Sequence, residues 1–166
     1  MALDGSYITV EEADAYAAAE LDASAWDALS AAQKAAALCQ ATDEIDAVRW
    51  QGRVYDEDQE RAFPRIAGEL PSDDADGALA TAIWDYDDDA GEAVVPEAVK
   101  RATALQAMSL AAGVREARLD DRHDGVTGTS AGGVSETYDA GRPAEILCRR
   151  AWQLLRRYRL RSGKIV

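Results

Sequence analysis

Several residue types are scarce in this sequence of 166 residues. It contains one histidine, two cysteines and one phenylalanine, and aromatic residues make up only 7% of it. The cysteines, Cys39 and Cys148, form no CxxC motif and suggest no disulfide framework. A catalytic triad would have to use His123, which stands in the polar stretch LDDRHDGV. The sequence therefore predicts a protein that is not an enzyme and that uses no metal or cofactor.

Long apolar runs and a complete calcium motif are also missing. No apolar stretch approaches the roughly 20 residues of a membrane-spanning helix, and no signal peptide is visible, so we expect a soluble protein that is made inside the cell. The stretch DYDDDAGEAVVP places Asp85, Asp87 and Asp89 at alternate positions of an EF-hand loop. Ala90 stands where that loop needs glycine, and Pro96 stands where it needs glutamate. We interpret the stretch as a solvated acidic loop.

Acidic residues are in excess, and the charge is distributed unevenly. The formal net charge of the chain is −13. Residues 142–166 contain eight lysine or arginine residues and one acid, Glu145, so this end carries +7 and the rest of the chain carries −20. A difference this large predicts two surfaces with different partners. The alternative is that the basic end packs against the acidic body of the same chain.

Alanine supplies much of the apolar content, which predicts a lean helical core with closely packed helices. Helix-capping boxes at Thr9 and Ser30 predict helices over residues 10–21 and 31–48. Large side chains should anchor the few wide contacts in such a core. We expect the following anchors: Trp26, Leu38, Ile45, Trp50, Phe63, Leu105, Leu147 and Leu154.

The second half of the chain carries further helix and hairpin signals. Pro96 suits the first position of a helix and Gly113 suits the residue beyond its end. Alternation from Val134 to Tyr138 predicts a β-hairpin or a mobile loop. A last helix is expected from Pro143 to about Leu160. Its core-facing stripe should contain Leu147, Ala151, Leu154 and Tyr158.

These signals together predict one architecture. The fold class is mainly α: a small helical bundle with a long acidic loop from Ile66 to Ala93, a short β-hairpin, a C-terminal helix and an extended tail. Residues 1–160 should form a single domain, and residues 161–166 should form the tail.

Several stretches, taken in order, carry a resemblance to a known family. They are SYITVEEADAYAAAEL, ALCQATDEIDAVRWQGR, QERAFPR and VVPEAVKRATALQA. The chain resembles the head–tail connector proteins of tailed bacteriophages and gene transfer agents, which are also called adaptors or head-completion proteins. Some members are labelled DnaT-like single-strand-DNA-binding proteins. The resemblance runs from Ser6 to about Gly113 and continues more loosely, whereas the acidic insert between Arg65 and Val95 departs from the family.

The resemblance implies a structural role in the virion neck. The subunit would assemble into a ring, commonly of twelve copies, beneath the portal protein, and genome DNA would pass through the ring to the next neck protein, a stopper or tail terminator. The protein would be made in the host bacterial cytoplasm and would not contact a membrane. The C-terminal helix or tail would reach the portal. The candidate portal-binding residues are Arg149, Arg156, Arg157, Arg159, Arg161, Lys164, Ile165 and Val166.

A second function is compatible with the same basic end. In this alternative the chain is a DnaT-like protein that binds single-stranded nucleic acid through its C-terminal helix, with Trp152 and Tyr158 stacking on bases between the arginines. Two features oppose it: the rest of the chain carries −20, and Tyr158 also fits the core-facing stripe. The connector is therefore the leading hypothesis.

Overall fold

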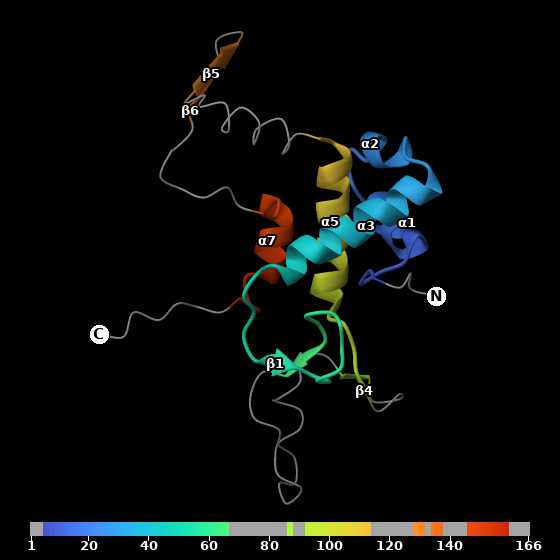
Figure 1. Cartoon of the computed structure of the whole chain (residues 1–166). Coiled ribbons are helices and arrows are strands. Elements are labelled where there is room, and N and C mark those ends of the chain that lie inside the picture. Colours follow the sequence, from blue (N-terminus) through green and yellow to red (C-terminus); the bar gives the residue numbers. More distant parts are fainter. Residues whose placement is uncertain are drawn as a thin grey trace, which may run out of the picture.

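The computed structural model describes residues 5–66, 86–87, 92–113, 128–131, 134–137 and 146–159, and within these residues it is mainly helical (Figure 1). The helices are α1 (Val10–Ala17), α2 (Ser24–Asp27), α3 (Ala31–Asp46), α5 (Glu97–Ala111) and α7 (Arg149–Leu155). Three antiparallel pairs of short strands accompany them: β1 (Arg53–Val54) with β2 (Arg65–Ile66), β3 (Tyr86–Asp87) with β4 (Glu92–Ala93), and β5 (Gly128–Ala131) with β6 (Val134–Thr137). The predicted fold class is confirmed, and β5 and β6 form the expected hairpin.

The predicted capping boxes begin α1 and α3. The Thr9 hydroxyl accepts a hydrogen bond from the Glu12 amide at 3.2 Å, and the Glu12 carboxylate accepts one from the Thr9 amide at 2.8 Å. Both helices end earlier than predicted, at Ala17 and Asp46. Each closes with a three-residue turn, as in the hydrogen bond from the Val48 amide to the Ile45 carbonyl. Such turns tighten a helix end and redirect the chain.

Helix α5 begins one residue later than its sequence suggests. Pro96 is its N-cap, with φ −57° and ψ 141°, and its carbonyl accepts hydrogen bonds from the amides of Val99 and Lys100. The prediction that Pro96 is the first helical residue is therefore wrong, because its ψ is extended rather than helical. Gly113 lies beyond the helix end with φ 65°, a left-handed conformation that suits glycine.

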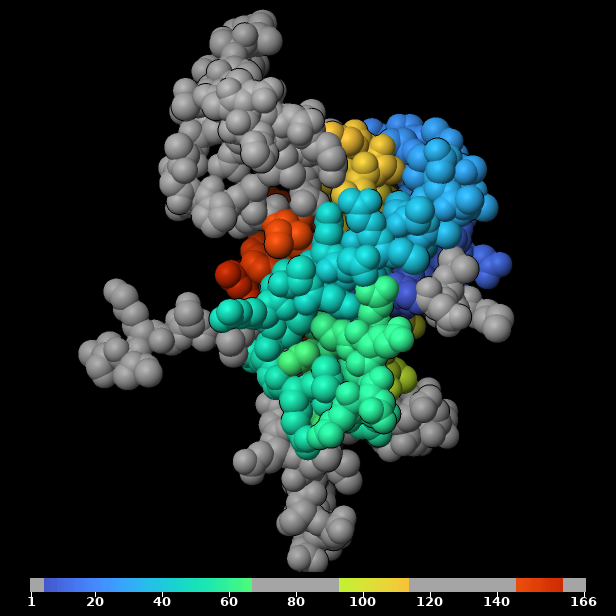
Figure 2. Space-filling view, viewed as in Figure 1, coloured from blue at the N-terminus to red at the C-terminus, as the bar shows by residue number. Residues whose placement is uncertain are grey.

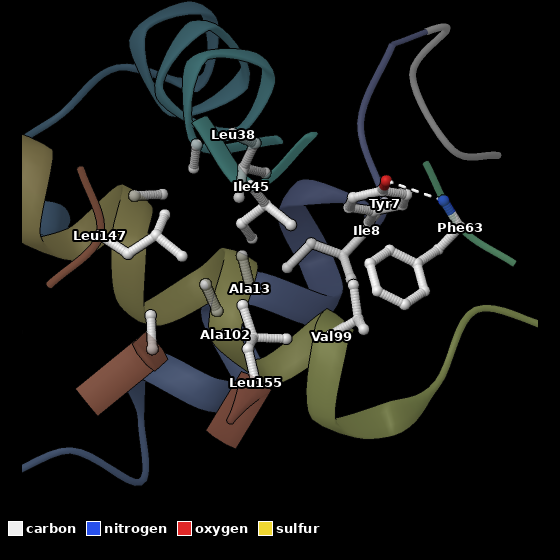
Figure 3. Packing of buried hydrophobic residues seen from close by; sticks show 14 of the residues in the cluster. Tyr7, Ile8, Ala13, Leu38, Ile45, Phe63, Val99, Ala102, Leu147 and Leu155 are labelled. Carbon is white, nitrogen blue, oxygen red and sulfur yellow. Dashed lines mark hydrogen bonds between the residues drawn. The ribbon is translucent and has the colours of Figure 1, made fainter. Parts of the chain in front are cut away.

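Helix α5 lies at the centre of the structure and packs against α1, α2, α3 and α7 (Figure 1). The predicted alanine-rich core is confirmed, and the alanines with no exposed surface are Ala13, Ala41, Ala102, Ala104, Ala107 and Ala151. These small side chains let the helices approach closely around larger groups such as Leu38, Ile45 and Leu155 (Figure 3). Most of the expected anchors are buried, namely Trp26, Leu38, Ile45, Trp50, Phe63, Leu105 and Leu147.

An aromatic cluster of four residues joins three parts of the chain that are distant in sequence. The ring of Phe63, the one phenylalanine, lies 6.0 Å from that of Tyr7, 5.4 Å from that of Trp50 and 5.7 Å from that of Tyr158. The Phe63 amide donates to the Tyr7 hydroxyl at 3.1 Å (Figure 3). The cluster therefore fixes the segment after α3 and the end of α7 against the same core.

Candidate functional site

The start of α7 is held by a buried amide on α5. The Gln106 side chain has no exposed surface, and its oxygen accepts a hydrogen bond from the Cys148 amide at 2.7 Å. Its nitrogen donates to the Glu44 carboxylate on α3 at 2.5 Å. Cys148 is the N-cap, with extended backbone angles. The prediction of a helix from Pro143 is therefore too long: residues 146–148 are not helical, and residues 143–145 lie outside the described residues.

The buried face of α7 differs from the predicted stripe at one position. Leu147, Ala151, Leu155 and Tyr158 are buried, whereas Leu154 is only partly buried. Leu154, a predicted core anchor, packs against the core but stays partly exposed, and the fully buried leucine of α7 is Leu155. The reason is geometric, because Leu155 lies four residues after the buried Ala151 on the same face of α7, and Leu154 lies about 100° away around the helix.

The end of α7 is attached to the segment that follows α3. The Gln51 amide donates to the Tyr158 carbonyl at 2.8 Å, and the Gln51 side chain donates to the Arg159 carbonyl at 2.6 Å. Trp50 and Arg159 form an antiparallel bridge. Because these bonds hold Tyr158 and Arg159 against the segment after α3, α7 ends at Leu155 and not near Leu160 as predicted.

One arginine of α7 contacts the acidic part of the protein. Arg150 makes a two-pronged ion pair with Glu20, in which its Nη2 lies 2.9 Å from Oε1. The side-chain hydrogen bonds of this pair lower the pKa of Glu20 and raise the pKa of Arg150. The alternative interpretation, in which the basic end packs against its own body, thus holds for this side chain.

Unlike Arg150, the candidate partner-binding arginines in and just after α7 form no ion pair within the described residues. Arg149, Arg156, Arg157 and Arg159 are exposed, and none has a carboxylate within ion-pair distance in the described part of the chain. The Arg157 guanidinium lies 4.6 Å from the centre of the Tyr158 ring, to whose hydroxyl it also donates. These arginines are available to a negatively charged partner.

The aromatic residues in and just after α7 already contact other side chains of the protein. The Tyr158 ring is 1% exposed and belongs to the aromatic cluster around Phe63. Trp152 is partly buried, and the Arg159 guanidinium lies 4.7 Å from the centre of its ring. A base could stack on Trp152 only if Arg159 moved away.

Four predicted residues, Arg161, Lys164, Ile165 and Val166, lie outside the described residues, as do His123 and most of the acidic loop. Among the residues that the structure describes, no group of three or more His, Cys, Asp or Glu side chains could hold a metal ion. No helix in the same part of the chain is long and apolar enough to cross a membrane.

Sequence reasoning missed Gln51 and Gln106, the two glutamines that position α7. Gln106 carried a signal, because it is a polar residue within the apolar stretch ATALQAMSLAA, and a buried amide needs partners. Gln51 carried none, since its partners are backbone carbonyls more than 100 residues away in the chain.

The fold and the site define a mainly helical protein whose last described helix and the residues just after it carry exposed arginines that have no carboxylate partner among the described residues. A family described as "Putative DnaT-like ssDNA binding protein" matches residues 3–165, and the chain belongs to this family. No curated protein and no solved structure matches the chain.

Proposed function

We propose that the protein is a structural head–tail connector subunit of a tailed phage or gene transfer agent. In this role it forms a ring beneath the portal, commonly of twelve copies, and extends the DNA channel toward the next neck protein. It acts in the virion neck without catalysis and without a cofactor. The motifs that resemble the connector family support the proposal.

The observation that carries the proposal is the group of exposed arginines in and just after α7. Arg149, Arg156, Arg157 and Arg159 have no carboxylate partner in the described part of the chain, although the chain as a whole is strongly acidic. Guanidinium groups form bidentate, charge-assisted hydrogen bonds with carboxylates. A surface of this kind suits attachment to an acidic protein assembly, and the portal is the partner that the resemblance implies.

Binding of single-stranded DNA is the second candidate function, and the family description favours it more directly than it favours the connector. The same arginines would contact phosphates. The burial of Tyr158 and the position of Arg159 over Trp152 count against it, because proteins that bind single strands usually stack bases on open aromatic rings.

Electron cryo-microscopy of purified particles tests the connector directly. A ring of this chain between the portal and the tail is the expected result. A chain truncated after Leu160 keeps the described core, so it should fold but attach weakly to the portal, and its particles should be packaged heads without tails. Absence of the chain from complete particles would overturn the proposal.

A binding measurement separates the second candidate from the first. Phosphate contacts by six or more cationic residues weaken binding about a thousandfold between ~50 and ~200 mM salt. We expect no binding of a 30-nucleotide oligothymidylate near physiological salt. Submicromolar binding that disappears when Arg156 and Arg157 are changed to Gln would place DNA binding ahead of the connector.

A further inference from the structure

The arginines at the end of α7 have neighbours from a distant part of the chain. Trp50 pairs with Arg159, so the segment between α3 and β1 lies directly beside the end of α7. Two further exposed arginines lie here, Arg49 in this segment and Arg53 at the start of β1. In the space-filling view, the surfaces of α7 and of the chain that leaves α3 adjoin (Figure 2). We use the term bipartite arginine surface for Arg49, Arg53, Arg156, Arg157 and Arg159.

Among the described residues, four basic side chains outside this surface are paired with carboxylates. Lys34 pairs with Asp14 at 2.8 Å, and Lys100 pairs with Glu12 at 3.5 Å. Arg61 and Arg150 also pair with carboxylates. In contrast, no member of the bipartite arginine surface has a carboxylate within 4 Å among the described residues. Within the described part of the chain, the acidic excess therefore does not neutralise this surface.

Hydrogen bonds from Arg65 fix the backbone of the segment that carries Arg49 and Arg53. The Arg65 guanidinium donates to the carbonyls of Gln51 at 2.8 Å, Gly52 at 2.6 Å and Ala62 at 3.1 Å. Because its guanidinium is bonded to backbone carbonyls, we do not include Arg65 in the bipartite arginine surface. Because Gln51 also bonds to Tyr158 and Arg159, the two halves of the surface are held together before any partner binds.

We propose that the bipartite arginine surface docks onto a carboxylate-rich face of a partner protein, and that Arg49 and Arg53 share this contact with α7. The proposal rests on the proposed function, in which the partner is the portal. It adds a second segment, about 100 residues earlier in the sequence, to the expected C-terminal attachment.

Two observations favour a folded acidic protein over a nucleic acid. The exposed acids Asp56, Glu57, Asp58 and Glu60 follow Arg53 closely and would repel a continuous chain of phosphates, whereas a folded partner can place its carboxylates opposite the arginines alone. The aromatic rings of α7 are also buried or covered, which removes the stacking platform that single strands use.

The test measures binding of full-length protein to the purified portal oligomer at ~100 mM salt. The variants are Arg53→Gln and the double variant Arg49→Gln/Arg53→Gln. Arg101→Gln is the matched control for the single variant, because Arg101 is exposed on α5, has no ion pair among the described residues and lies outside the surface. We expect the double variant to bind about tenfold or more weakly, and Arg101→Gln to differ from wild type by less than about twofold.

The outcomes distinguish this inference from the proposed function. If wild type binds the portal and the double variant binds equally well, the connector stands and the role of Arg49 and Arg53 is overturned. Failure of wild type to bind the portal overturns the proposed function itself. If wild type binds a 30-nucleotide oligothymidylate at the same salt and the double variant loses that binding, the partner is a nucleic acid and the protein partner is overturned.

Discussion

Replacing Gln106 with leucine should release α7 from the rest of the protein. Leucine has nearly the same size as glutamine but offers neither donor nor acceptor. The substitution removes the hydrogen bond that Gln106 accepts from the Cys148 amide at 2.7 Å and the one that it donates to Glu44 at 2.5 Å. The position has no exposed surface, so water cannot easily replace either partner.

The expected loss of unfolding free energy follows from these contacts. A hydrogen bond between neutral groups contributes about 1 kcal/mol and one to a charged group about 1.5–3 kcal/mol, and a buried amide left without a partner costs about 1–3 kcal/mol. Burial of the leucine side chain offsets about 1–2 kcal/mol of this. We therefore expect Gln106→Leu to lower stability by about 2–4 kcal/mol.

Urea unfolding followed by circular dichroism measures this loss, which corresponds to a midpoint lower by about 1 M or more. Gln153→Leu is the control, because Gln153 is exposed on α7, and it should change stability by less than about 0.5 kcal/mol. A Gln106→Leu midpoint within about 0.2 M of wild type would refute the reasoning that this amide holds α7 in place.

A second substitution at the same position adds a pH dependence of known sign. Gln106→Glu keeps an acceptor for the Cys148 amide but sets a carboxylate against that of Glu44. Repulsion raises the folded-state pKa of one carboxyl above its unfolded value of about 4.3. The penalty is therefore complete above the raised pKa and disappears as the pH falls toward ~4, so the gap to wild type should shrink on acidification.

Three further predictions concern other contacts. Leu155→Ala should destabilise by about 2–4 kcal/mol and Leu154→Ala by about 1 kcal/mol, measured by urea unfolding, because only Leu155 is fully buried. Tyr7→Phe removes a hydroxyl that donates to Asp46, and should lower the thermal midpoint by several degrees, equivalent to about 1–3 kcal/mol. The hydrogen bond from the N-cap amide lowers the pKa of Glu12, so Glu12→Gln should cost about 0.5 kcal/mol above pH ~5, and this cost should disappear as the pH falls through the lowered pKa in pH-dependent unfolding.

Local interactions explain which elements could be predicted from the sequence. The capping boxes of α1 and α3 depend on residues three positions apart, such as Thr9 and Glu12, and both helices begin where these signals place them. The alanine-rich core follows from composition. Periodicity also identified most of the buried face of α7, although it selected Leu154 where the structure fully buries Leu155, four residues after Ala151.

Long-range contacts explain what the sequence could not provide. Gln51 donates hydrogen bonds to the carbonyls of Tyr158 and Arg159 just after the end of α7. No residue near this helix end in the sequence predicts where the helix stops. Arg49 and Arg53 stand in a segment of mixed polarity that carries no binding motif. They become candidate binding residues only because the fold places their segment beside the end of α7. The division into a domain of residues 1–160 and a tail of residues 161–166 stays a prediction.

The internal contacts of α7 determine how its arginines can act on a partner. Arg150 ties the helix to Glu20, Gln106 holds its beginning and Gln51 holds its end. These three attachments hold α7 in place within the subunit. The remaining exposed guanidinium groups are therefore not required for folding and lie on a rigid part of the protein. A preorganised charged surface loses less entropy on binding than a flexible one, so its effect should appear as slow dissociation from the partner. Loosening α7 through Gln106→Leu should therefore accelerate dissociation even though every arginine is still present.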